Sequence, residues 1–126
     1  MGDDTQPRIR ERIRNSKNIV LFLSSFTVSS KALREEIEYG ITDQGLPVIA
    51  VYPDFLEKSD IILCESKTIR QQVKDLWGKL PMFRDSMHMV PTLHIPKKKE
   101  LIRKALQDPD FESGTKAKVD KYFYPC

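Results

Sequence analysis

The sequence of 126 residues is poor in cysteine and histidine, the residues that most often bind metals or do redox chemistry. Its two cysteines are Cys64 and Cys126, and its two histidines are His88 and His94. No pair among these four has zinc-finger spacing or the i, i+4 spacing of a helical metal site. We therefore expect no metal site, and in the absence of a secretory context we expect both thiols to be reduced.

Glycine is equally sparse, with five residues at positions 2, 40, 45, 78 and 114. They form neither G-x-G-x-x-G nor a Walker pattern, so a nucleotide would have to be held in another way. Ser24 and Ser25 lack the G-x-S-x-G elbow of serine hydrolases. There is also no apolar run of membrane-spanning length and no signal-peptide pattern, which predicts a cytoplasmic protein that does not enter membranes.

Charge of one sign is not dominant, since the net charge is +3, but basic residues gather in residues 8–17 and 97–104. Neither cluster is interleaved with exposed aromatics or belongs to a nucleic-acid-binding motif, so we expect no specific nucleic-acid partner. The clusters are typical of solvated helix faces. The alternative is a general attraction of an anionic dinucleotide.

What the sequence does contain is a strand, a helix and a strand in quick succession. Residues 19–23 (IVLFL) form a continuous apolar run, residues 30–42 carry an i, i+4, i+8 stripe of Leu33, Ile37 and Ile41, and residues 47–52 (PVIAVY) form a second apolar run. Continuous branched runs are typical of parallel strands buried on both faces. A third strand is predicted at residues 90–95, giving a three-layer α/β sandwich with a flavodoxin-like parallel sheet.

The remaining segments are predicted as follows. Helices are expected at 7–16, 65–78, 80–87 and 98–106, and residues 61–64 are either an extra strand or a helical turn. Trp77 is expected in the core. Residues 108–126 form a polar tail whose aromatic end, Tyr122, Phe123 and Tyr124, is expected to dock on the domain. The length suits a single domain over residues 1–126, with a basic N-terminal helix within residues 1–17.

Ligands of open α/β sheets bind beyond the carboxyl ends of the strands, which directs attention to residues 24–30. On the following helix, Glu36 borders the apolar stripe, whereas Glu35 and Glu38 point away and are expected in solvent. Glu36 is thus the candidate functional carboxylate. The alternative is that all three glutamates belong to a solvated face.

Residues 15–53 (NSKNIVLFLSSFTVSSKALREEIEYGITDQGLPVIAVYP) resemble the central half of TIR domains, with most similarity to the TIR-like proteins of the bacterial Thoeris anti-phage system. The resemblance implies that Glu36, followed by Ile37, is the catalytic residue of NAD cleavage by a glycohydrolase or cyclase. NAD would be the substrate and no further cofactor would be needed. Ser24, Ser25, Phe26, Thr27 and Ser30 would face the NAD phosphates.

Two features differ from the TIR pattern. Ala32 occupies a position four residues before Glu36 that is often aromatic in TIR domains. Nothing before Ile19 matches the first strand-helix-strand portion, so we expect an N-terminally incomplete TIR-like domain with weak or no activity of its own. Its uncovered edge strand at residues 19–23 predicts self-association. The alternative to an enzyme is a non-catalytic TIR-like interaction module.

Overall fold

A parallel sheet of three strands forms the centre of the computed structural model, which describes residues 16–111 and 123–124. Strand β1 (Ile19–Phe22) pairs with β2 (Val48–Tyr52), and β2 pairs with β5 (Thr92–Pro96). Both pairings are parallel, with Ile19 opposite Val48 and Val48 opposite Thr92. The three predicted strands are therefore confirmed, together with their adjacency and direction.

Burial differs among the three strands. Every residue of β2 and β5 is buried, whereas β1 alternates between buried and exposed positions. The exposed positions of β1 are Val20 and Phe22, which are 37% and 52% exposed. The expected self-association through the β1 edge stays a prediction.

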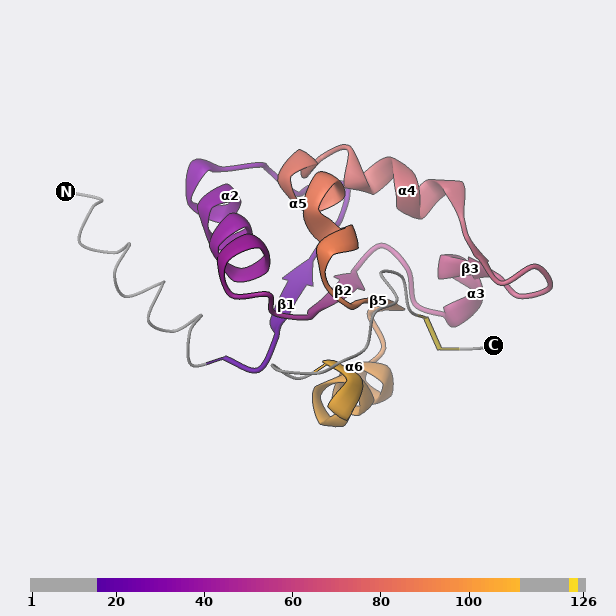
Figure 1. The fold of residues 1–126 in the computed structure, drawn as a ribbon. Helices are drawn as coiled ribbons and strands as arrows, with labels where there is room; N and C mark the ends of the chain where they lie inside the picture. The colour runs from indigo at the N-terminus through magenta and orange to yellow at the C-terminus, as the bar shows by residue number, and fades with distance from the viewer. Residues whose placement is uncertain (1–15, 112–122, 125–126) are drawn as a thin grey trace.

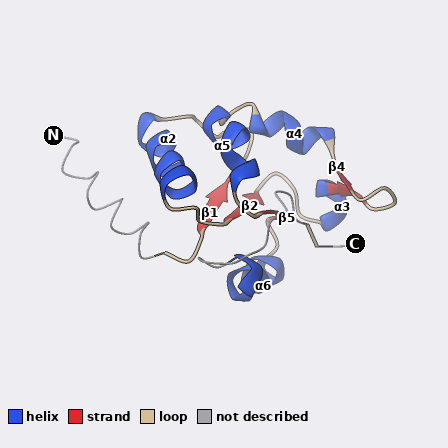
Figure 2. Cartoon of the chain, in the orientation of Figure 1, coloured by secondary structure: helices blue, strands red, loops and turns tan. Residues whose placement is uncertain are grey.

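Helices lie on both faces of the sheet (Figures 1 and 2). On one face lie α2 (Lys31–Ile37), α4 (Gln71–Trp77) and α5 (Pro81–Ser86), and on the other lies α6 (Lys99–Gln107). Two short 3-10 helices, η3 (Met87–Met89) and η4 (Pro109–Phe111), flank β5 and α6 in the chain. The arrangement confirms the α/β sandwich of the flavodoxin-like and TIR-like class.

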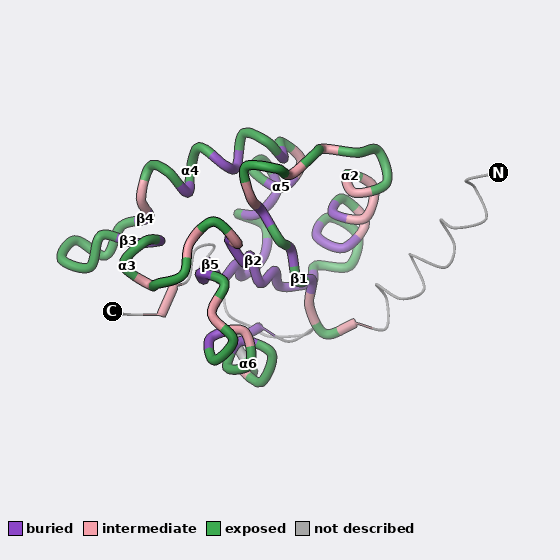
Figure 3. The backbone as a smooth tube through the Cα atoms, turned by 180° about the vertical axis from the view of Figure 1, so that it is seen from behind, coloured by how far each residue is buried: buried purple, intermediate pink, exposed green. Residues whose placement is uncertain are grey.

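Two apolar clusters, one on each face, hold the layers together, and Figure 3 shows the buried positions concentrated in the sheet. The larger cluster includes Ile37, Ile41 and Trp77, as the helical stripe and the tryptophan predict. The smaller joins Ile49 and Val51 of β2 to Leu101 and Ala105 of α6. The face toward α6 thus carries fewer covering residues than the opposite face.

Helix α2 passes directly into a π-helix, η2 (Glu38–Asp43), before the chain enters β2. Gly45 ends this unit with φ of +63°, a left-handed conformation that glycine adopts without strain. The N–H groups of Gly45 and Leu46 donate to the carbonyls of Ile41 and Gly40. This glycine C-cap turns the chain back toward the sheet.

The region between β2 and α4 differs from the prediction. The helix expected at 65–78 begins at Gln71, because Thr68–Ile69 form a short strand, β4, antiparallel to β3 (Ile62–Leu63). The segment that was open to two interpretations contains both, since α3 (Lys58–Ile61) leads directly into β3. Two-residue strands carry too little pattern to be recognised from sequence.

The aromatic end of the chain docks on the domain, as predicted, in its two described residues. Phe123 packs against the larger cluster and Tyr124 against the smaller one. The Tyr124 hydroxyl donates to Asp108 across 3.2 Å, and the Lys104 ammonium lies 4.3 Å from the centre of the Tyr124 ring. Tyr122 lies outside the described residues, as do nearly all of the predicted helix at 7–16 and most of the polar tail.

One expectation about the cysteines is wrong, because Cys64 is disulfide-bonded. Cys126, the other cysteine of the chain, lies outside the described residues. Phe123 and Tyr124 line a small cavity with Ile61 and Ile62, which precede Cys64 in the chain. Across the described part of the chain, no helix has the length and apolar character needed to cross a membrane.

Candidate functional site

The loop of residues 24–30 leaves the carboxyl end of β1, as the sequence predicts, and most of its backbone N–H groups donate to acceptors within the fold. The Ser24 N–H donates to Thr27 Oγ1 at 2.8 Å and the Phe26 N–H to Ser24 Oγ at 3.1 Å. The N–H groups of Thr27 and Ser30 donate to backbone carbonyls of Ser24 and Val28. The loop is therefore folded on itself and does not present a row of unbonded N–H groups.

One contact ties this loop to the next strand of the sheet. The Ser25 N–H donates to Asp54 Oδ2 across 2.8 Å, and Asp54 lies just beyond the carboxyl end of β2. Sequence reasoning did not select Asp54. Its position directly after a buried strand is the signal that could have identified it, because strand ends meet at one edge of a parallel sheet.

Ser30 and the helix that follows position the acidic residues. The Ser30 hydroxyl accepts from the Leu33 N–H at 3.2 Å and so caps α2. Such a cap satisfies one of the unpaired donors of the first turn. Ser30 thus has a structural role as a helix cap, and its contact with a ligand stays a prediction.

The three glutamates of this segment have different environments. Glu36 is half-buried beside the buried Ile37, in agreement with its place at the border of the apolar stripe. Glu38 is exposed, as expected. For Glu35 the expectation of a solvent position is wrong, because its side chain is 34% exposed and its Oε2 atom is buried without a hydrogen bond among the described residues.

Glu35 has one charged neighbour on its own helix, the Lys31 ammonium at 3.9 Å. Lys31 itself is 82% exposed, so this pair contributes little to stability. A helical wheel describes directions around one helix axis and cannot include burial by segments from elsewhere in the chain. In a test that substitutes Glu36, the exposed Glu38 is therefore a better control position than Glu35.

A hydrogen-bonded network of three side chains, which the sequence did not predict, lies inside the larger apolar cluster. The Trp77 indole N–H donates to the Tyr52 hydroxyl at 2.8 Å, and that hydroxyl lies 2.6 Å from His94 Nδ1. The His94 ring stacks on Tyr52 with centroids 5.8 Å apart. Burial raises the pKa of Tyr52, and the hydrogen bond from Trp77 acts in the opposite direction.

Because Tyr52 and His94 are 0% and 1% exposed, this group cannot reach a ligand in solution, and its role is to hold β2, β5 and α4 together. His88, the other histidine, is exposed. Within residues 16–111 and 123–124, no three histidine, cysteine or acidic side chains are placed to share a metal ion.

The basic residues near α6 divide into engaged and unengaged groups. Lys98 donates to Glu57 Oε2 at 2.9 Å, which raises the pKa of Lys98, and Lys104 covers the Tyr124 ring. Lys97, Lys99 and Arg103 are exposed and surround a shallow hollow of about 440 Å³ whose other lining residues are Ile102 and Leu106. This hollow lies on the face of the sheet opposite α2.

These features define a TIR-like α/β protein, with a capped helix carrying a half-buried glutamate at the carboxyl end of an edge strand. Comparison with known families agrees with this class: residues 2–58 match the model of the Thoeris protein ThsB, TIR-like domain. The matched segment covers a little under half of the chain and contains β1, the loop of residues 24–30, α2 and β2. Residues 2–58 of the chain are therefore similar to the TIR-like domain of the Thoeris protein ThsB.

Proposed function

We propose that this protein processes NAD in anti-phage defence, with Glu36 as the catalytic carboxylate. The Thoeris match associates the chain with defence, and the observation that supports the enzymatic step is the extent of that match. The matched segment includes both Glu36 and the loop of residues 24–30. The loop ends at Ser30, which caps the helix that carries Glu36. The reaction is cleavage of the bond between nicotinamide and ribose.

In this reaction the C1′–N bond breaks and its electron pair leaves with nicotinamide, so positive charge grows on the ribose. Glu36, held half-buried by the packing of α2, would stabilise that charge and bind the ribose hydroxyls. Water, or a second nucleophile of the substrate, then bonds to C1′ to give a hydrolysed or cyclised ADP-ribose product. A partly desolvated carboxylate is more effective here than one in bulk water.

The loop of residues 24–30 would contact the phosphates through side chains. The backbone N–H groups of residues 24–27 and of Ser30 are engaged, that of Ser25 with Asp54, whereas the Ser25 side chain is exposed. Phosphate binding by the Ser25 N–H would require displacement of the Asp54 carboxylate. Asp54 therefore competes with an anionic ligand for the same donor.

The test is an assay of nicotinamide release from NAD by the 126-residue chain and by the product of any longer reading frame. Glu36→Gln keeps the shape of the side chain and removes its charge. Glu38→Gln makes the same change at an exposed position of the same segment. Turnover that is lost with Glu36→Gln and retained with Glu38→Gln supports the proposal, and full activity of both variants contradicts it.

A non-catalytic interaction module is the second candidate, and one observation favours it. Phe26 and Val28, in the middle of the predicted phosphate-binding loop, are 87% and 75% exposed. Large apolar side chains at such exposure are typical of protein contacts more than of phosphate contacts. Absence of turnover from every form of the protein would favour this candidate.

A further inference from the structure

The face of the sheet that carries α6 is only partly covered by the described residues. Val20 and Phe22 of β1 lie opposite Ile49 and Val51 of β2 in the parallel register. Ile49 and Val51 belong to the cluster that α6 covers, and paired residues of neighbouring strands point to the same face. Val20 and Phe22 therefore point to the α6 side, where they remain 37% and 52% exposed.

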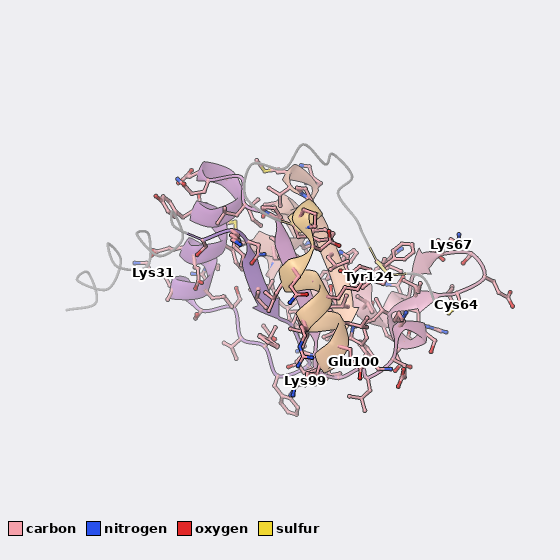
Figure 4. The ribbon with its side chains drawn as sticks, turned by 90° about the horizontal axis from the view of Figure 1, so that it is seen from below. Lys31, Cys64, Lys67, Lys99, Glu100 and Tyr124 are labelled. Atoms are coloured by element: carbon pink, nitrogen blue, oxygen red, sulfur yellow. The ribbon has the colours of Figure 1, made fainter. Side chains whose placement is uncertain are left out.

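The apolar flank of α6 faces this uncovered strip. Lys104 lies on one flank of α6, where its ammonium contacts the Tyr124 ring. Tyr124 in turn lines a cavity with residues of α3 and β5. Strand β5 is the edge of the sheet away from β1, so this flank of α6 faces away from β1. Figure 4 shows Tyr124 and β1 on opposite sides of α6. Ile102 and Leu106 lie on the other flank at i, i+4 spacing, and Leu106 is 46% exposed.

The rim of this strip is positively charged. Lys97, Lys99 and Arg103 line the hollow with Ile102 and Leu106, are exposed, and have no ion-pair partner within the described part of the chain. Their neighbour Lys98 is paired with Glu57 and takes no part. We call the surface formed by Val20, Phe22, Ile102 and Leu106, with the rim of Lys97, Lys99 and Arg103, the α6 groove.

We propose that the α6 groove binds an acidic amphipathic helix of a partner protein. A parallel sheet is normally covered by helices on both faces, and on this face the one described helix, α6, leaves Val20 and Phe22 of β1 exposed. A second helix would pack beside α6 at about 8–10 Å between axes. Its apolar side chains would contact Val20, Phe22 and Leu106, and its carboxylates would pair with the three rim cations.

Charge complementarity selects this occupant over the chain's own N-terminal residues. Residues 1–15 contain Ile9 and Ile13, and their four arginines outnumber their three acidic residues, Asp3, Asp4 and Glu11, so their net side-chain charge has the same sign as the rim. Like charges brought together at an interface oppose docking, whereas opposite charges speed association and fix orientation. The partner helix therefore carries glutamate or aspartate beside its apolar stripe.

The probe is a fluorescent 14-residue helical peptide with leucines at i, i+3, i+4 and i+7 and glutamates on both flanks, compared with the same peptide bearing lysines. Fluorescence anisotropy with the full chain should show binding of the acidic peptide and little of the basic one, with affinity falling as salt rises. The double variant Lys99→Glu, Arg103→Glu should weaken binding by at least about tenfold, and Phe22→Ser should also weaken it. Lys79→Glu and Met89→Ser, exposed residues outside the groove, are the matched controls.

Each contrary outcome overturns the proposal. Equal binding of the two peptides, or unchanged binding by the double variant with its circular dichroism spectrum intact, excludes this surface. If the wild-type chain is a dimer that Phe22→Ser dissociates, the occupant is a second copy. If Ile9→Asp, Ile13→Asp raises peptide affinity, residues 1–15 are the occupant, and sedimentation with phosphatidylserine vesicles but no peptide binding identifies a membrane surface.

Discussion

The backbone N–H of Ser25 and the Oδ2 atom of Asp54 lie 2.8 Å apart and join the loop after β1 to the loop after β2. A carboxylate that accepts from a backbone donor makes a short, charge-assisted bond. This loop of residues 24–30, which carries all five residues predicted to contact the phosphates, is therefore anchored beyond the end of the neighbouring strand.

Substitution Asp54→Ala should release this loop. We expect the unfolding free energy to fall by about 1 kcal/mol, since the bond is exposed, and hydrogen exchange at the Ser25 amide to become faster. Asp54→Asn keeps an oxygen acceptor and should show a smaller change. Unchanged protection of the Ser25 amide in Asp54→Ala would mean that the contact does not persist in solution.

Ser30→Ala should destabilise the protein by about 1 kcal/mol, because it removes the acceptor for the Leu33 N–H at the start of α2. Ser29→Ala is the adjacent control, since its backbone carbonyl, which accepts from Arg34, is retained. Urea denaturation measures both. An equal effect of the two substitutions would contradict the assignment of Ser30 as the cap.

Tyr52→Phe should lower the unfolding free energy by about 1–3 kcal/mol at neutral pH. The substitution leaves the Trp77 indole N–H and His94 Nδ1 buried without the hydroxyl that contacts both. Chemical denaturation followed by tryptophan fluorescence reports directly on Trp77, the single tryptophan of the chain. A stability within about 0.5 kcal/mol of the wild type would show that the network contributes little.

The same residue predicts a dependence on alkaline pH. Burial raises the pKa of Tyr52 in the folded state, so above about pH 10 the unfolded chain loses this proton first. The unfolded state then binds fewer protons than the folded one, and stability falls by about 1.4 kcal/mol per pH unit from this group. Tyr52→Phe should lack this part of the slope, and identical slopes would contradict the burial of the phenol.

The central fold could be predicted from sequence because its signals are local. Continuous branched runs predicted β1, β2 and β5, and the spacing of Leu33, Ile37 and Ile41 predicted the inner face of the crossover helix. Single residues at the site were harder. The burial of Glu35 Oε2 and the bond between Ser25 and Asp54 depend on segments that come together only in the folded chain.

The disulfide of Cys64 has the same cause, since it depends on where distant parts of the chain lie. Phe123 and Tyr124 line a cavity with residues of α3 and β5 and with Ile62 of β3, although they are about 60 residues away from β3 in the chain. No spacing rule applies to two cysteines separated by half the chain. Composition and compartment arguments therefore gave the wrong redox state for Cys64.

Nicotinamide release by Glu36→Gln and Glu38→Gln tests the proposed function most directly. Removing one well-placed charged group from a partly desolvated site costs about 2.7–4 kcal/mol of barrier, or about a hundred- to a thousandfold in rate. We predict this loss for Glu36→Gln, with circular dichroism unchanged, and activity within about twofold of the wild type for the exposed Glu38→Gln. Wild-type turnover in the Glu36→Gln variant would contradict the catalytic assignment and leave the interaction module as the function.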